Sequence, residues 1–343
     1  MPQYRAALIG CGRHIRTEGA TGSGMAHHHV RGYMSTPECE VVACADIVDE
    51  NRSAFADEYS IAATYSDYNE MLATEKPDIV SICTWPHLHA EMVINAANAG
   101  VKAVHCEKPM ADTLGDARRM KQSCEENDVQ LTFNHQNRFE GRWNTALKLL
   151  QDGEIGELRS MEGHWGNILD TGTHWLDLFN MYNGETPVDW VMAQIHRHSD
   201  AKAFGARVEN QALVQVHYTN QVQGLLVMGE DNTIWAEHRL WGTEGLIEVD
   251  WPQVRVRGKG DRGWRILDGE ATDGCVAAGI ADLAKSLKSG SEPILSAKKA
   301  YAATEVIFAA YESSRRRGRV ELPLDIDDNP LHQMIDAGLV ASG

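Results

Sequence analysis

The sequence has no long hydrophobic run and few basic residues. No uninterrupted apolar segment approaches the roughly 20 residues of a membrane span, and the first residues lead into a predicted strand without the apolar core of an export signal. Lys and Arg number 32 against 49 Asp and Glu, a formal net charge of −17. Because such a surface repels polyanions, we expect neither a membrane nor a nucleic acid as partner.

Cysteine is sparse and irregularly spaced. The seven cysteines form no zinc-type spacing with histidine, and several lie in apolar runs where a thiol behaves as a small hydrophobe. We therefore expect reduced thiols and a cytoplasmic protein. The run His27-His28-His29 lacks the i, i+4 spacing of a helical metal pair, so no metal site is expected.

Short β-branched runs alternate with helical patterns in the first part of the chain. The predicted strands are Ala6–Ile9, Val41–Ala45, Ile79–Thr84, Val101–Cys106 and Val129–Phe133, and the helices between them lie around 25–34, 50–58, 67–73, 88–99 and 113–127. This alternation predicts an α/β fold with a doubly wound parallel sheet, which binds ligands at the carboxyl ends of its strands.

The rhythm changes after about residue 135. A helix (about 140–152), a strand (157–165) and a helix (170–182) precede longer alternating strands between 188 and 268, and helices follow at about 272–289 and 297–317. This pattern predicts a second α/β domain with an open, largely antiparallel sheet, whose free face we expect to form a homodimer or homotetramer. The expected divisions are 1–134, 135–325 and a tail, 326–343.

A glycine turn closes the first predicted strand. Gly10 and Gly12 let the backbone approach a pyrophosphate, but Ile15 replaces a third glycine, and residues 13–23 form an insertion of roughly ten residues. Asp46 ends the second strand, where a carboxylate accepts hydrogen bonds from a ribose and repels a 2′-phosphate. The sequence favours NAD, and Arg52 leaves NADP open.

Two further polar signatures follow. Glu107-Lys108-Pro109 closes a strand, while Asp170, His174 and Asp177 lie one and two turns apart on one helix face. Taken alone, the helical segment has a simpler interpretation: a capping aspartate, a core histidine and a solvated aspartate. The three signatures in this order favour a nicotinamide-dependent dehydrogenase.

Together these motifs resemble the Gfo/Idh/MocA family, which includes glucose-fructose oxidoreductase and inositol 2-dehydrogenase. The resemblance implies a Rossmann domain with a bound nicotinamide cofactor and chemistry on a sugar or cyclitol hydroxyl, with Lys108, Asp170 and His174 as the catalytic residues. The residues predicted to bind cofactor are Gly10, Cys11, Gly12, Arg13, His14, Asp46, Thr84, Trp85, His89, Glu107, Lys108 and Pro109. Those predicted to bind substrate are Lys108, Asn137, Arg138, Trp165, Asp170 and His174, with His164 and Asn167 as weaker candidates.

Oxidation of a secondary alcohol needs a hydride acceptor and a base near the hydroxyl. His174 is the expected base, with Asp170 orienting its ring and Lys108 donating a hydrogen bond to the developing alkoxide. Two alternatives stay open from the sequence. One is a redox-neutral enzyme that cleaves or isomerises glycosides with tightly bound NAD, and the other is a non-catalytic regulator that kept the cofactor fold.

Overall fold

A computed structural model describes residues 2–20, 22–229, 236–269 and 274–341. Thr21 of the insertion, residues 230–235 of the strand region and residues 272–273 of an expected helix lie outside the described residues. The chain divides into two compact units. The first contains 1–112, 116–136 and 274–300, and the second contains 113–115, 137–273 and 301–343.

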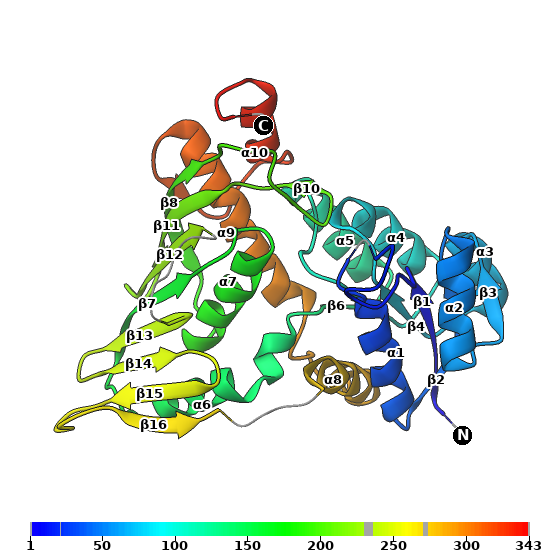
Figure 1. Ribbon diagram of the computed structural model, residues 1–343, viewed down its shortest axis with the longest axis horizontal. Helices are drawn as coiled ribbons and strands as arrows, with labels where there is room; N and C mark the ends of the chain where they lie inside the picture. Colours follow the sequence, from blue (N-terminus) through cyan, green and yellow to red (C-terminus); the bar gives the residue numbers. More distant parts are fainter. Residues whose placement is uncertain (1, 21, 230–235, 270–273, 342–343) are drawn as a thin grey trace. The chain divides into compact units, whose positions relative to one another are not determined.

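A six-stranded, all-parallel sheet forms the first unit (Figure 1). Its order is β3-β2-β1-β4-β5-β6, with bounds β1 Tyr4–Ile9, β2 Cys39–Ala45, β3 Ala63–Tyr65, β4 Ile79–Ile82, β5 Ala103–Cys106 and β6 Gln130–Phe133. The connecting helices are α1 Met25–Ser35, α2 Asp49–Tyr59, α3 Tyr68–Glu75, α4 Pro86–Asn98 and α5 Leu114–Glu126. This is the strand order of dinucleotide-binding folds, so the predicted α/β fold is confirmed.

One later helix packs within this first unit. Helix α8 (Cys275–Ser289) lies against α1, where Gly32 allows the close approach: a Cβ added there would stand 2.6 Å from Cδ1 of Ile280. Ile280 and Leu283 join Tyr33 in one buried cluster. Residues 274–300, which the sequence analysis assigned to the second domain, therefore complete the core of the first unit.

A nine-stranded, largely antiparallel sheet organises the second unit. Its order is β16-β15-β14-β13-β7-β12-β11-β8-β17, and β7 pairs in parallel with β12. The bounds are β7 Leu158–His164, β8 Val188–His196, β11 Gln211–Tyr218, β12 Gln223–Gly229, β13 His238–Gly242, β14 Leu246–Val249, β15 Gln253–Arg257, β16 Arg265–Asp268 and β17 Val320–Glu321. Strands β9 Lys202–Ala203 and β10 Ala206–Arg207 form a separate hairpin.

Helices pack on one face of this sheet (Figure 1). They include α6 Gly141–Gln151, α7 Thr171–Tyr182 and most of α9 Ala297–Arg316, while η1 Gln136–Phe139 precedes α6 and α10 Pro330–Asp336 follows β17. Residues 326–341 are part of this unit, because Leu331, Met334 and Ile335 of α10 are buried in its core. The side chain of Asn329 caps α10 by accepting hydrogen bonds from the backbone N–H groups of Leu331 and His332.

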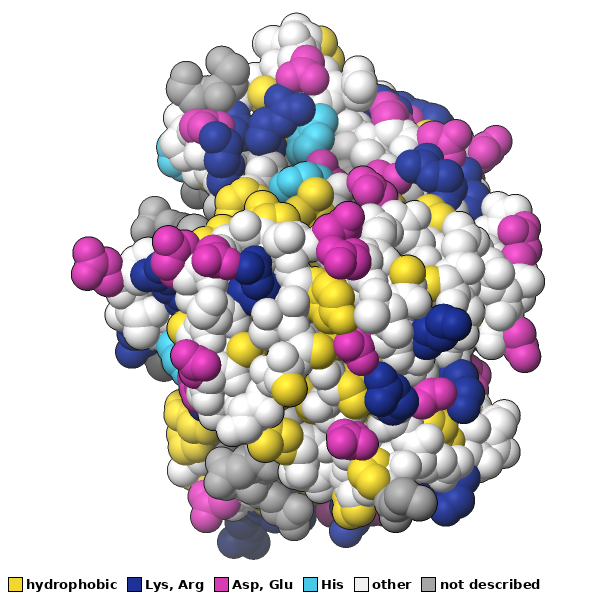
Figure 2. Space-filling view, turned by 90° about the vertical axis from the view of Figure 1, so that its right-hand side faces the viewer, with side chains coloured by type: hydrophobic (Ala, Val, Ile, Leu, Met, Phe, Trp, Pro, Cys, Tyr) yellow, Lys and Arg dark blue, Asp and Glu magenta, His cyan; other side chains and the backbone are white. Residues whose placement is uncertain are grey.

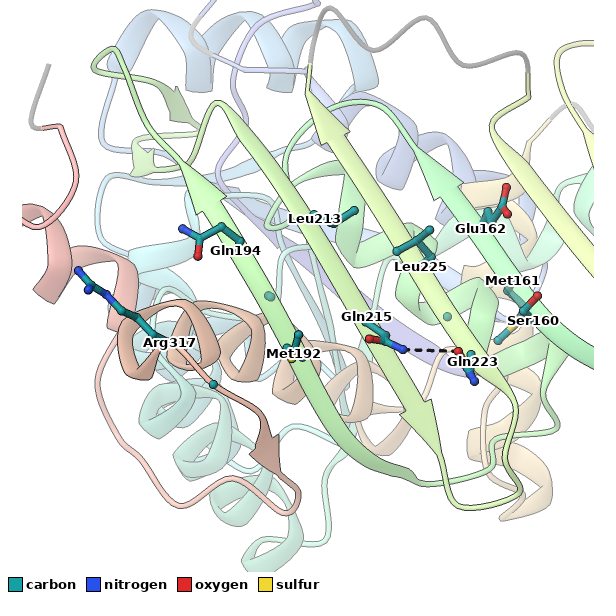
Figure 3. Close-up of a pocket in the computed structure, with 13 residues that line it drawn as sticks. Ser160, Met161, Glu162, Met192, Gln194, Leu213, Gln215, Gln223, Leu225 and Arg317 are labelled. Carbon is teal, nitrogen blue, oxygen red and sulfur yellow. Dashed lines mark hydrogen bonds between the residues drawn. The ribbon is translucent and has the colours of Figure 1, made fainter.

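The opposite face of the sheet is open. Met192 and Leu213 are 51% and 52% exposed, although alternate residues of the same strands are buried. A shallow cavity of about 520 Å³ lies on this face, lined by residues of β7, β8, β11 and β12 such as Gln215 and Leu225 (Figure 3). The predicted open antiparallel sheet is confirmed.

The surface and the thiols agree with the composition. On the face shown in Figure 2, acidic and basic side chains are interspersed. All seven cysteines are free thiols. Among the described helices, none combines the length and the apolar character that crossing a membrane requires.

Candidate active site in two halves

The glycine turn and Asp46 form one preorganised unit at the carboxyl edge of the parallel sheet. Gly10 has φ of 85°, and a Cβ there would stand 2.8 Å from the carbonyl oxygen of Cys83, so only glycine fits. Asp46 Oδ2 accepts hydrogen bonds from the backbone N–H groups of Cys11 (2.8 Å) and Gly12 (3.2 Å). A turn with two glycines beside a carboxylate fits a dinucleotide, whose pyrophosphate and ribose need these two features.

Arg52 contacts the backbone of Asp46 and the side chain of Asp49. Its guanidinium donates to the backbone oxygen of Asp46 at 2.8 Å and pairs with Asp49. The same Asp46 carboxylate accepts a hydrogen bond from the backbone N–H of Val48 at 2.8 Å. The arginine that left NADP open is therefore engaged with backbone and with a second carboxylate.

The first residues of the insertion bind back onto the unit. Arg13 Nε donates to Oδ1 of Asn51 at 2.8 Å, and its Nη1 donates to the backbone oxygen of Glu18 at 2.8 Å. His14 Nε2 lies 2.8 Å from a carboxylate oxygen of Glu58 on α2. Both predicted cofactor residues thus face α2 or the insertion itself.

Glu107 is the buried neighbour of the predicted catalytic lysine. Its Oε1 lies 2.8 Å from Nε2 of His29 and accepts a hydrogen bond from Nδ2 of Asn134 at 2.8 Å, while Oε2 accepts from the backbone N–H of Lys108 at 3.2 Å. Burial opposes ionisation of Glu107, but His29, Lys108 and Asn134 together lower its pKa to about 2. Glu107 is therefore a carboxylate at neutral pH.

The network continues behind His29. Nδ1 of His29 lies 3.0 Å from Oγ of Ser81, and that hydroxyl lies 2.8 Å from the hydroxyl of Tyr33. His29, Ser81 and Tyr33 are fully buried. The sequence analysis missed His29 and Asn134, because α1 and β6 approach Glu107 only in the folded sheet. The one available signal was a histidine triplet on a helix that follows the glycine turn.

His89 joins the loops that follow β4 and β5. Its Nδ1 lies 3.1 Å from the backbone oxygen of Pro109, and its Nε2 lies 3.1 Å from that of Thr84. The side chain is fully buried, and burial lowers its pKa against the opposing effect of these carbonyls. Strand β4 ends at Ile82, so Thr84 and the 39% exposed Trp85 lie in the loop.

In the second unit, the N-terminal end of α7 carries two of the predicted catalytic residues. Asp170 occupies the N-cap position, and its backbone N–H donates to Oδ1 of Asn167 at 2.8 Å. His174 follows one turn later and is 9% exposed. Lys108 belongs to the first unit, so the two halves of the predicted catalytic set stand on different units.

Asp177 forms a buried ion pair. Arg138 Nε donates to its Oδ2 at 2.7 Å and Nη2 to its Oδ1 at 2.9 Å, and Arg138 Nη1 reaches Glu185 at 2.6 Å. The two acids raise the pKa of Arg138 against the effect of its burial. Asp177 is 1% exposed, so the simpler interpretation of this residue as solvated is wrong. Arg138 holds α7 to η1.

Trp165 stands out by its backbone. It has φ of 79° in the segment between β7 and α7, a conformation that bulky residues rarely adopt, and it is 55% exposed. Backbone strain of this kind concentrates at functional sites. Two other residues predicted to bind substrate differ in their exposure. His164 is 3% exposed, whereas Asn137, the residue before Arg138, is partly exposed.

Comparison with known proteins supports the cofactor half directly. Residues 4–135 match the sequence model of the GFO_IDH_MocA family, described as an oxidoreductase family with an NAD-binding Rossmann fold. Residues 4–135 therefore carry the NAD-binding domain of this family. The resemblance inferred from the motifs is thereby confirmed.

Individual relatives match different shares of the chain. A D-apiose dehydrogenase from Paraburkholderia graminis is 32% identical over 166 residues, which span 48% of this chain and 40% of the relative. A myo-inositol 2-dehydrogenase from Thermotoga maritima is 24% identical over 86% of this chain and 94% of its own. An oxidoreductase from Agrobacterium radiobacter, solved with NAD⁺, L-tartaric acid and magnesium, shares the fold at a TM-score of 0.79, with 22% identity over 93% of this chain and 98% of that one.

Proposed function

We propose that this protein is an NAD-dependent dehydrogenase that oxidises a secondary hydroxyl of a sugar or cyclitol. The observation that carries the proposal is the glycine turn bound to Asp46, on the same sheet edge as the buried Glu107 beside Lys108. Strands β2, β1, β4 and β5 are neighbours, so the residues that follow them share one edge.

NAD is the preferred cofactor in this proposal. Asp46 would accept hydrogen bonds from the adenosine ribose, and a carboxylate there repels a 2′-phosphate. Arg52 would have to leave its contacts with the backbone oxygen of Asp46 and with Asp49 to meet such a phosphate. The glycine turn would cradle the pyrophosphate.

The mechanism assigns one task to each residue. A bound nicotinamide supplies the hydride acceptor. His174 accepts the hydroxyl proton, and Asp170, one turn earlier on α7, orients the imidazole and stabilises its charged form. Lys108 donates a hydrogen bond to the oxygen as negative charge develops on it. Glu107 positions Lys108 through the backbone N–H at 3.2 Å, and His89 fixes the loop around Pro109.

The substrate class rests on the relatives. D-apiose and myo-inositol dehydrogenases both act on polyhydroxylated compounds, as their names state. Trp165 offers an exposed aromatic face of the kind that packs against the apolar face of a sugar ring. We propose that Trp165 and Asn137 contact the substrate and that Arg138, through its ion pair with Asp177, is a positioning residue.

The deciding experiment monitors NADH absorbance while the purified protein is offered NAD, or NADP, with a panel of monosaccharides, cyclitols and glycosides. Growth of the signal with NAD supports the proposal, and its loss in Lys108→Ala and His174→Ala, with NADH affinity retained, supports the assigned roles. Consumption of a glycoside without NADH release would instead establish the redox-neutral enzyme. Cofactor binding without turnover of any compound would favour the regulator.

We also propose that the open sheet face joins copies of this chain. Met192, Leu213 and Leu225 would be covered by the matching face of a second copy, which is the arrangement expected of an isologous interface. Light scattering should give a dimer or tetramer, and Leu213→Glu should lower its mass. A parent chain that stays monomeric at high concentration would contradict the interface.

The free thiols favour a reducing, cytoplasmic location.

A further inference from the structure

Three metal-ligating side chains from three distant segments meet beside the glycine turn. His14 comes from the insertion, His27 from α1 and Glu58 from α2, and each offers a ligand atom within 4.8 Å of the others. They share a cavity of about 400 Å³ with Gly12 and Arg13. The sequence analysis expected no metal, because it found no zinc-type spacing of Cys and His and no i, i+4 pair in the histidine run. These three residues lie far apart along the chain and form no such pattern.

The contacts place a carboxylate against both imidazoles. Glu58 Oε2 is 2.8 Å from Nε2 of His14 and 3.7 Å from Nδ1 of His27. The two rings stack with centroids 3.6 Å apart. The distances from Glu58 Oε2 to the two ring nitrogens are similar to those between ligand atoms on one tetrahedral zinc, because each ligand atom lies about 2.0–2.2 Å from the ion.

One ring nitrogen of His27 has a hydrogen-bond partner and the other has none. The side chain is 5% exposed; its Nδ1 lies 3.0 Å from the hydroxyl of Tyr59, whereas its Nε2 is buried with no hydrogen-bond partner among the described residues. Because Tyr59 engages Nδ1, Nε2 is the ring nitrogen of His27 that remains open to a ligand.

We propose that His14, His27 and Glu58 form a zinc site that ties the insertion to α1 and α2. Two imidazoles and one carboxylate are a common zinc donor set, and the partly exposed side of the cluster leaves the fourth position to water. Zinc binding requires the His14 ring to turn out of its stack, because an ion cannot lie in the planes of two nearly parallel rings. His14 has room to turn, since its side chain is 42% exposed.

The site has a defined consequence for the fold. The insertion is attached to α2 through exposed contacts such as His14 with Glu58, which alone contribute little to stability. A metal ion shared by the three segments would fix residue 14, and with it the exit of the glycine turn. The inference concerns metal binding and does not depend on the proposed reaction.

The test measures zinc binding to the tag-free, chelator-treated chain by calorimetry, with cobalt as a spectroscopic substitute. One zinc per chain is expected, together with the intense visible bands of tetrahedral cobalt. Glu58→Gln and His14→Gln should each weaken binding by at least about tenfold. The matched control is His28→Gln, an exposed histidine next to His27, which should bind as the parent does.

A second measurement reports on the insertion itself. Zinc should slow tryptic cleavage after Arg16, an exposed residue, in the parent and in His28→Gln but not in Glu58→Gln. Absence of zinc binding, or equal binding by parent, Glu58→Gln and His14→Gln, would overturn the proposal. Circular dichroism of each variant separates loss of the site from loss of the fold.

Discussion

At the scale of single residues, the most informative contact is between His29 and Glu107. The carboxylate is 5% exposed and carries its charge inside the first unit, where an unpaired ion is costly. His29 supplies the strongest of the interactions that keep its pKa near 2. The histidine therefore stabilises the charge that positions Lys108.

Replacing His29 with Gln should lower the free energy of unfolding by about 1–3 kcal/mol, because the buried carboxylate of Glu107 loses a hydrogen-bond partner. The pKa of Glu107 should rise at the same time. Urea unfolding at pH 7 measures the first effect, and carbon NMR of the Glu107 carboxyl measures the second.

The control for this prediction is His28→Gln, which changes an exposed neighbour and should alter stability by less than about 0.5 kcal/mol. A double-mutant cycle with Glu107→Gln tests the pair itself. The cycle compares the loss of unfolding free energy caused by His29→Gln in the parent with the loss caused in Glu107→Gln. Equal losses would show that the two side chains do not interact energetically.

At the scale of elements, helix α7 combines two roles along its length. Its first turn presents Asp170 and His174, while its second half is fixed by the buried contact between Asp177 and Arg138. The bidentate geometry matches the planar guanidinium to the carboxylate. The segment 137–139 and the helix are thereby held as one piece.

Asp177→Asn should therefore destabilise the second unit by about 1.5–3 kcal/mol, because the guanidinium of Arg138 loses its bidentate carboxylate and keeps the contact with Glu185. Chemical denaturation followed by tryptophan fluorescence measures the loss. Asp189→Asn, at a half-exposed carboxylate of β8, is the matched control and should change little. A stable Asp177→Asn protein that no longer forms NADH would instead place Asp177 in the chemistry.

Elements were easier to predict than the contacts between them. The strands and helices of the first unit follow local patterns of β-branched and amphipathic residues, so their positions could be predicted within a few residues. Strand β3 has only three residues and gives no such pattern. Helix α8 could be predicted as a helix, but its packing on α1 depends on the space at Gly32, which no periodicity encodes.

At the scale of the whole molecule, the residues of the candidate site were also easier to predict than the contacts between them. Asp46, Glu107 and Lys108 could be predicted because they end strands that share an edge. The buried contacts could not be predicted: His29 is 78 positions from its partner Glu107, and Arg138 is 39 positions from its partner Asp177. Such pairs form only when separate elements pack, and a single sequence contains no signal for their proximity.

Both units bury neutral histidines. Burial lowers the pKa of His105, in the first unit, to about 3, and that of His238, in the second, well below its usual value. His238 is enclosed by Trp143, Trp175 and Phe179, and neither ring nitrogen has a hydrogen-bond partner among the described residues. In the unfolded chain both histidines titrate near pH 6.5.

Below pH 6.5 the unfolded chain therefore binds protons that the folded chain does not, so stability must fall as the pH decreases. Each such histidine contributes a loss of up to about 1.4 kcal/mol per pH unit until its folded pKa is reached. Urea midpoints should decline steadily between pH 7 and pH 5. His238→Leu removes one titrating group at nearly constant volume and should flatten this slope, whereas His198→Leu, at an exposed position, should keep it. An unchanged slope in His238→Leu would mean that His238 is not a neutral buried group.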